Sequence, residues 1–132
     1  MRHTKAFTLI ELMVVILIVG ILAAASVPLM RGRVESAKWS EANAMAGTIR
    51  AAARVRFAEV GAVPAGVVND AAMTALGFTT GDLTGTYFVP GDFSIGAADA
   101  NGNVAVTVTA SQANAPTAGT TKTLSQDGKT WQ

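Results

Sequence analysis

The chain has 132 residues, of which 50% are hydrophobic, 14% charged and 6% aromatic. That is roughly the length of one domain, and so few charges exclude a disordered acidic or basic tail. The formal net charge of +1 excludes the strongly basic surface that holds nucleic acid. Cysteine is absent and His3 is the one histidine, which argues against thiolate metal sites and histidine-based catalysis. We therefore expect neither an enzyme nor a bound cofactor or metal.

An apolar segment dominates the first part of the chain. Residues 7–30 read FTLIELMVVILIVGILAAASVPLM, with Glu11 as their only charge. As a helix this segment is about 36 Å long, enough to span a bilayer core of about 30 Å. The region after it exceeds about 60 residues and can be translocated despite the charges of Arg31 and Arg33. We expect the short N-terminal tail to be cytoplasmic.

The helical pattern continues through residues 31–60, which are rich in alanine and contain no proline. Their apolar residues recur at the spacing of one helix face. That face consists of Val34, Met45, Ile49, Ala52, Ala53, Phe57 and Val60. Gly61 and Pro64 then provide a stop signal. The whole helix would measure on the order of 80 Å, and its second half needs a partner for the apolar stripe.

Two groups of charges lie on this second half. Glu35, Lys38 and Glu41 are three residues apart, where opposite charges are neighbours on the outer surface of a helix. The densest basic group is Arg50, Arg54 and Arg56. Since no aromatic residues are interleaved for base stacking, we interpret it as a solvated face or a source of salt bridges between subunits, not as a DNA-binding site.

Residues 61–132 predict short elements joined by turns. Asn69 or Asp70 caps a short helix that runs through Leu76 and stops at Gly77. The predicted strands cover residues 86–89, 93–97, 104–110 and 121–125. A turn at residues 101–102 joins the second strand to the third, and one at residues 127–128 joins the last strand to residues 129–131. Such a small antiparallel sheet can bury its apolar face only against the long helix, which gives an α+β fold.

Two oxygen-rich loops offer ligands for calcium. One contains Asp92, and the other contains Asp99 and Asn101. Neither loop has the spacing of an EF-hand. Turn formation explains the same residues, so we interpret both loops as turns.

Glu11 is the most informative residue of the chain. A carboxylate inside a hydrophobic segment costs about 2.5–3.5 kcal/mol on insertion scales and marks a functional site by default. The alternative is that Glu11 lies close enough to the cytoplasmic surface to remain hydrated. The residues around it distinguish the two interpretations.

Residues 6–11, AFTLIE, follow a short basic tail and resemble the processing site of type IV prepilins, a family that includes the pseudopilins of type II secretion systems. Gly20 and Pro28 fall where this family commonly has a glycine and a proline in its N-terminal helix. The resemblance covers residues 5–30 closely and the helix-plus-sheet plan of the remainder loosely. Ala6 departs from the family pattern, which usually has glycine before the cut.

The resemblance implies a domain plan and a processing route. Residues 1–6 would be the leader, 7–30 the membrane and filament-core helix, 31–60 its amphipathic continuation and 61–132 the C-terminal sheet region. A prepilin peptidase would cut between Ala6 and Phe7 and N-methylate Phe7. The subunit would wait as a single-pass protein in the bacterial inner membrane. An inner-membrane assembly platform would then polymerise it into a helical homo-oligomer, either an extracellular pilus or a periplasmic pseudopilus.

The same scheme implies a role for Glu11 in assembly. The new amine of Phe7 on an incoming subunit would meet Glu11 of its neighbour. Two such charges about 4 Å apart attract by roughly 4 kcal/mol at an effective dielectric near 20, before desolvation is counted. Pro28 removes a helix hydrogen bond and should kink the helix. By resemblance, the stretch from Gly20 to Pro28 unwinds locally after assembly.

Two alternatives remain open at this point. The absence of cysteine favours a pseudopilin or a small cysteine-free pilin, but the tyrosine-proline segment and the C-terminal calcium loop common in pseudopilins are not clear here, and we favour a pilus. A signal peptidase cut after Ala25 would instead release a soluble binding domain. The charge of Glu11 and an apolar stretch longer than the usual 7–15 residues argue against that cut.

Overall fold

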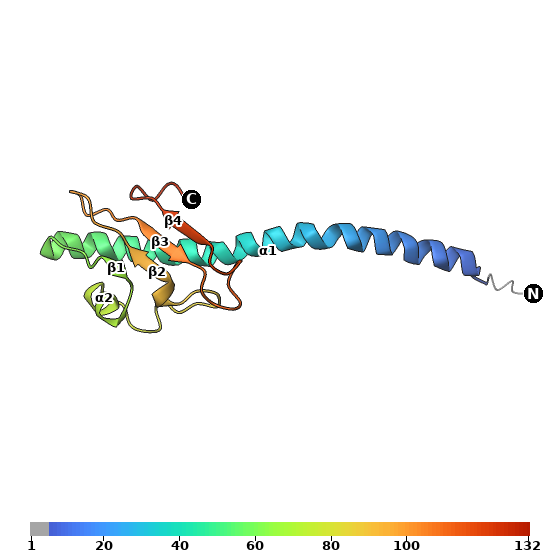
Figure 1. The fold of residues 1–132 in the computed structure, drawn as a ribbon, viewed down its shortest axis with the longest axis horizontal. Helices are drawn as coiled ribbons and strands as arrows, with labels where there is room; N and C mark the ends of the chain where they lie inside the picture. Colours follow the sequence, from blue (N-terminus) through green and yellow to red (C-terminus); the bar gives the residue numbers. More distant parts are fainter. Residues whose placement is uncertain (1–5) are drawn as a thin grey trace, which may run out of the picture. The chain divides into compact units, whose positions relative to one another are not determined.

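The computed structural model describes residues 6–132, whose helices and strands are labelled in Figure 1. The elements in chain order are α1 (Leu9–Val60), β1 (Gly66–Val67), α2 (Asp70–Ala75), the 3-10 turn η1 (Pro90–Asp92), β2 (Phe93–Ile95), β3 (Val106–Thr109) and β4 (Thr121–Leu124). The predicted α+β class, one long N-terminal helix with a small antiparallel sheet, is confirmed. Arg2, His3 and Lys5, the basic part of the predicted leader, lie outside the described residues.

The chain divides into two compact units after Val34. In the first unit every described side chain is exposed, and α1 runs through Pro28 without interruption. Among the described residues, α1 is the one helix long and apolar enough to cross a membrane, judged by length and composition. A helix that is apolar on all sides is stable only when lipid or other helices cover it. The first unit therefore needs cover that it does not provide for itself.

The second unit, Glu35–Gln132, contains the hydrophobic core. The buried residues of α1 all belong to this unit, and they are Trp39, Ala42, Ala46, Ile49 and Ala53. Their spacing alternates between three and four residues, so they form one face of the helix. The predicted stripe was right at Ile49 and Ala53 but wrong at its ends, because Val34 is 48% and Val60 52% exposed. Instead of Val34 and Val60, the buried face contains Trp39, Ala42 and Ala46.

The sheet has the order β1-β2-β3-β4, with every neighbouring pair antiparallel. Its register sets buried residues opposite one another, in the pairs Phe93–Val108, Ile95–Val106 and Val106–Leu124. These residues belong to the same core cluster as the buried face of α1. The alternate residues are less buried, and the hydroxyls of Thr107 and Thr123 lie 3.1 Å apart across β3 and β4. The predicted alternation of residues 104–110 thus follows the pleat of the sheet.

The predicted short helix is confirmed as α2. The side chain of Asn69 accepts a hydrogen bond of 2.9 Å from the N–H of Ala72, as an N-cap residue does. Leu76 is the C-cap residue. Gly77 follows with φ of +81°, the left-handed conformation that ends helices.

The two predicted turns are also present. Gly102, with φ of +76°, donates its N–H to the carbonyl of Asp99 at 3.0 Å. Gly128, with φ of +71°, donates to the carbonyl of Ser125 at 2.9 Å. The segment that returns after the second turn pairs with β4 through a single bridge at Trp131, so it is shorter than a strand.

The predicted strand over residues 86–89 is wrong. The N–H groups of Tyr87 and Phe88 donate to the carboxylate of Glu41 at 2.8 and 3.2 Å. The N–H of Val89 donates to the carboxylate of Asp92 at 2.9 Å. A strand needs its backbone donors for the ladder, and side chains have taken them here. Three strands of the sheet overlap predicted strands, and the fourth is β1. The sequence did not predict β1 because it is two residues long and begins with a glycine.

The predicted surface pairing of Glu35, Lys38 and Glu41 is corrected by the structure, because all three bind loops of the second unit. The carboxylate of Glu35 accepts from the hydroxyl of Thr117 at 3.0 Å. The ammonium of Lys38 donates to the carbonyl of Asn114 at 2.7 Å. A three-residue spacing shows which residues share a helix face, but not which distant loops cover that face.

Candidate functional site

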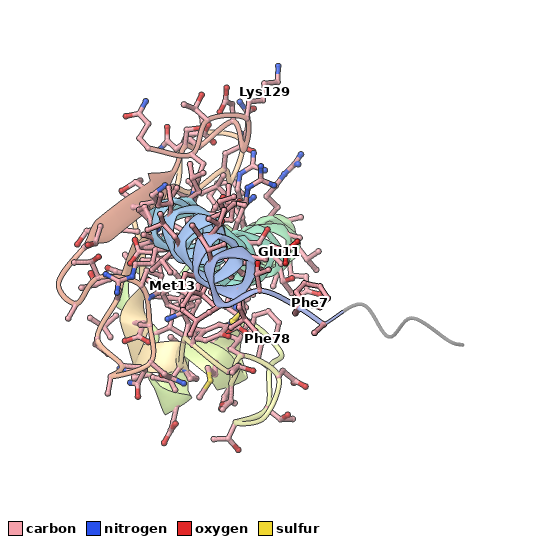
Figure 2. All side chains as sticks on the ribbon, turned by 90° about the vertical axis from the view of Figure 1, so that its right-hand side faces the viewer. Phe7, Glu11, Met13, Phe78 and Lys129 are labelled. Atoms are coloured by element: carbon pink, nitrogen blue, oxygen red, sulfur yellow. The ribbon has the colours of Figure 1, made fainter. Side chains whose placement is uncertain are left out.

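The N-terminal turn of α1 brings together two residues of the predicted processing and assembly site, Phe7 and Glu11, and a third residue that was not predicted, Thr8. Phe7 and Glu11 lie at this end of the helix (Figure 2), and Thr8 is the last residue before it. The N–H and the hydroxyl of Thr8 donate to Oε2 of Glu11 at 2.9 and 2.6 Å. In return, the N–H of Glu11 donates to the hydroxyl of Thr8 at 3.3 Å. This reciprocal pair is a capping box.

The capping box is the part of the site that the sequence analysis missed. Thr8 and Glu11 have the Thr-x-x-Glu spacing of this motif directly before an apolar run, and that signal was present in the sequence. It explains why the helix begins at Leu9. Local hydrogen bonding satisfies donors that the first turn of a helix otherwise leaves unpaired.

The capping box leaves Glu11 with a charge and with hydrogen-bonding capacity. Both Thr8 donors end on Oε2, so the carboxylate keeps lone pairs for a further donor. Both Glu11 and Phe7 are exposed, and Phe7 has 80% of its surface accessible. No other charged residue occurs in residues 7–30. Once the helix is surrounded by lipid or by other helices, a compensating cation has to come from elsewhere.

The structure does not bring Gly20 and Pro28 near this turn. At 1.5 Å per residue they lie about 13 and 25 Å beyond Glu11 along the helix. Gly20 is open to its surroundings, since an added Cβ would meet nothing within 4 Å. The hydroxyl of Ser26 donates to the carbonyl of Leu22 at 2.8 Å, a bond that often bends helices slightly. The kink or melting of this stretch stays a prediction.

The carboxylates of the two oxygen-rich loops form turns, as expected. Asp92 is buried and accepts hydrogen bonds from the N–H of Val89 and the hydroxyl of Ser111. Asp99 accepts from the N–H groups of Asn101 and Asn103, each at 2.8 Å. Within residues 6–132 there is no group of three histidine, aspartate or glutamate side chains placed to hold a metal ion.

Hydrogen bonds from Asn103 hold the pKa of Asp99 below its usual value. The side-chain amide of Asn103 is the largest cause, its N–H the next, and Arg54 adds a smaller electrostatic effect. The neighbouring Arg50 donates through Nε to the carbonyl of Gln126 at 2.9 Å. Two members of the basic group therefore act on loops of their own chain, which agrees better with a structural role than with DNA binding.

Comparisons with known proteins place the chain beside proteins that carry the same N-terminal motif or form fimbriae. Residues 1–27 match the family described as the prokaryotic N-terminal methylation motif. The chain is also similar to the fimbrial protein EcpC of Eikenella corrodens, with 44% identity over 61 residues. That match covers 46% of this chain and 40% of the curated relative. The resemblance drawn from residues 5–30 is confirmed.

Proposed function

We propose that this chain, a type IV pilin-like subunit, is the structural subunit of a type IV pilus filament. The observation that carries the proposal is the methylation motif at the head of an apolar segment, residues 7–30, whose side chains are all exposed and which contains one carboxylate. The fimbrial relative favours a surface pilus over a pseudopilus. In the filament, packing of residues 7–30 against the same residues of other subunits would replace lipid as their cover.

The route to the filament begins in the inner membrane. A prepilin peptidase would cut between Ala6 and Phe7 and N-methylate the new amine of Phe7. Both residues are exposed and precede α1, so the cut would fall in non-helical backbone, which a protease can bind in an extended form. Removing Arg2 and Lys5 with the leader would leave eight basic and nine acidic residues. An assembly platform would then extract the subunit from the bilayer.

Glu11 would set the axial position of each incoming subunit. Its carboxylate is already held in place by Thr8, and it retains lone pairs for the cationic amine of Phe7 on a neighbour. The attraction is roughly 4 kcal/mol at about 4 Å and an effective dielectric near 20, before desolvation. An unpaired carboxylate inside the bundle is costly, so misaligned subunits would be disfavoured.

The test is the substitution Glu11→Ala, with Glu59→Ala as the matched control at an exposed carboxylate of the same helix. We expect Glu11→Ala subunits to insert into the membrane and to be processed, but to yield few sheared surface fibres by electron microscopy. The control should form fibres normally. Normal fibre growth by the Glu11→Ala subunit would remove the proposed role of this residue.

Mass analysis of the mature N-terminus tests the proposal independently. A methylated Phe7 is expected, whereas a free Ser26 would indicate a secreted domain released by signal peptidase. Identification of the subunit in sheared surface fibres separates a pilus from a pseudopilus. Loss of type II secretion on deletion, with no surface fibre, would favour the pseudopilin.

A further inference from the structure

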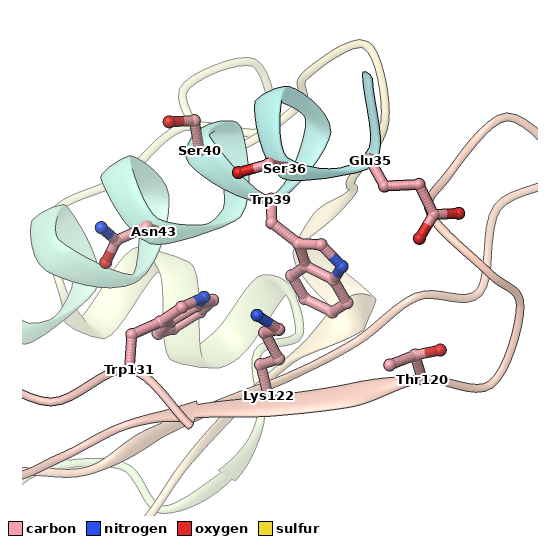
Figure 3. Close-up of a pocket in the computed structure, with 8 residues that line it drawn as sticks. All are labelled: Glu35, Ser36, Trp39, Ser40, Asn43, Thr120, Lys122 and Trp131. Atoms are coloured by element: carbon pink, nitrogen blue, oxygen red, sulfur yellow. The ribbon is translucent and has the colours of Figure 1, made fainter. Parts of the chain in front are cut away.

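A pocket of about 470 Å³ opens in the second unit between α1 and the C-terminal hairpin. Trp39 and Asn43 of α1 line one side, and Lys122 of β4 and Trp131 line the other. Figure 3 shows these side chains around the pocket. Its volume lies in the range of small-molecule sites, which combine aromatic walls with a few polar groups.

The first notable feature of the pocket is the indole N–H of Trp131. This atom is buried, and among the residues that the structure describes it has no hydrogen-bond acceptor. Indole nitrogen can only donate, and a buried donor without an acceptor is uncommon in folded proteins. Because this nitrogen is closed to solvent, a ligand in the pocket can satisfy it only when the flexible side chain of Lys122, whose ammonium Figure 3 shows beside it, moves aside.

The second feature is a positive charge beside that donor. The ammonium of Lys122 lies 5.4 Å from the ring centroid of Trp39, and the two indole rings are 6.1 Å apart in an edge-on arrangement. In Figure 3 the ammonium stands between the two rings. An ammonium held against an aromatic face is partly desolvated, which strengthens its attraction for an anion.

The negative charge that lines the pocket is at its other end. Figure 3 shows Glu35 far from Trp131, with its carboxylate turned outward. That carboxylate accepts from the N–H and the hydroxyl of Thr117 at 3.3 and 3.0 Å. Its charge is thus engaged with a loop, and the end with Lys122 and Trp131 remains electropositive.

We propose that this end of the pocket binds a carboxylate group. The ammonium of Lys122 and the indole N–H of Trp131 supply two donors, which suits the two oxygens of a carboxylate. A phosphate has more charge to compensate than one ammonium supplies. The carboxylate can come from a small acid in solution or from an aspartate or glutamate of a second copy of the chain. The carboxylate site itself does not depend on the proposed function, because its two donors belong to the second unit. Only the comparison of the two carboxylate sources uses assembled fibres and rests on that function.

The chain provides its own reporter for the test. Its two tryptophans both line the pocket, so a spectrum of the ¹⁵N-labelled full chain in detergent micelles contains two indole N–H signals. Substitution Trp131→Phe assigns them by removing one. Titration with propionate should move the Trp131 signal downfield and saturate in the millimolar range. Propionamide, which has the same shape without the charge, should move it at least tenfold less.

Variants at Lys122 define the contribution of the charge. We expect Lys122→Met to weaken the propionate effect at least tenfold and Lys122→Arg to retain most of it. The matched control is Lys129→Met, at an exposed lysine on the turn after β4 (Figure 2), and it should bind like the unaltered chain. An unchanged propionate titration in Lys122→Met, or equal shifts with propionate and propionamide in the unaltered chain, would overturn the proposal. If Lys122→Met fails to fold, the comparison of propionate with propionamide in the unaltered chain still decides the matter.

Assembled fibres distinguish the two sources of the carboxylate. If a second copy supplies it, the Trp131 signal is already shifted in fibres without added acid, and Lys122→Met reduces fibre yield. If a small acid supplies it, fibre yield is unchanged and the shift appears only on addition of propionate.

Discussion

The carboxylate of Glu41 on α1 accepts a hydrogen bond of 2.8 Å from the N–H of Tyr87, 46 residues further along the chain. The same carboxylate also accepts from the N–H groups of Thr86 and Phe88, each at 3.2 Å. One side chain of the helix therefore fixes three consecutive peptide groups of the connection that leads into β2. Hydrogen bonds to a charged acceptor contribute more than neutral ones.

The substitution Glu41→Gln should destabilise the second unit by about 1–3 kcal/mol, because it removes the charge and leaves fewer acceptor sites for three backbone donors. Urea unfolding of the full chain, followed by tryptophan fluorescence, reports on this unit because both tryptophans belong to it. The exposed Glu59 on the same helix gives the control Glu59→Gln, which should change stability by less than about 0.5 kcal/mol. Equal unfolding midpoints for the two variants would contradict the role of Glu41.

Gly102 should not tolerate a side chain. Its φ of +76° is unfavourable for other residues, and a Cβ would lie 2.6 Å from Cδ1 of Phe57. We expect Gly102→Ala to destabilise the second unit by about 2–4 kcal/mol, from backbone strain together with overpacking. Gly81 has open space and no such backbone constraint, so Gly81→Ala should be nearly neutral in the same urea experiment. A neutral Gly102→Ala would mean that the turn rearranges freely.

The first turn of α1 should fray when its capping box is removed. Thr8→Val keeps the shape of the side chain and deletes the hydroxyl that both donates to and accepts from Glu11. Loss of an N-cap residue typically costs about 1 kcal/mol. Amide hydrogen exchange in micelles should therefore accelerate several-fold in the first turn and remain unchanged near Gly20. If the first turn of Thr8→Val exchanged as slowly as that of the unaltered chain, the capping box would not stabilise the helix.

Acid should weaken the turn that Asp99 forms. Hydrogen bonds from Asn103 lower the pKa of this carboxyl below 3.8 in the folded chain, so the folded state binds fewer protons than the unfolded state near that pH. The stabilisation is complete above the unfolded pKa and is lost as the pH falls through the folded value. Asp99→Asn should flatten the fall in stability that accompanies acidification below about pH 5. An unchanged pH profile would show that Asp99 contributes nothing to this dependence.

The sequence predicted the parts of the fold that local chemistry determines. The long helix follows from an uninterrupted periodic pattern, α2 from Asn69 and Gly77, and the turn after β2 from its Asn-Gly pair. Glu11 was identified because a charge in an apolar run is costly wherever the helix lies. Each of these signals is contained in a few neighbouring residues.

The features that were missed depend on residues far apart in the sequence. The strand expected at residues 86–89 has suitable residues, but its first three N–H groups donate to Glu41, which no local pattern reveals. Trp39 lies on the buried face because Phe88 packs against it at 5.3 Å between ring centroids. The pocket beside Trp131 exists only after β4 and the C-terminal segment have met α1.

The consecutive strand order of the sheet has a consequence for how the protein is made. Each strand after β1 pairs with the one just before it in the chain. Only short loops separate β2 from β3 and β3 from β4, so these two pairs can close soon after their residues have been synthesised. Short loop closures of this kind are fast. Folding of the sheet can thus proceed in the direction of synthesis on a helix that is already made, and no strand has to wait, unpaired and prone to aggregate, for a strand other than the next one.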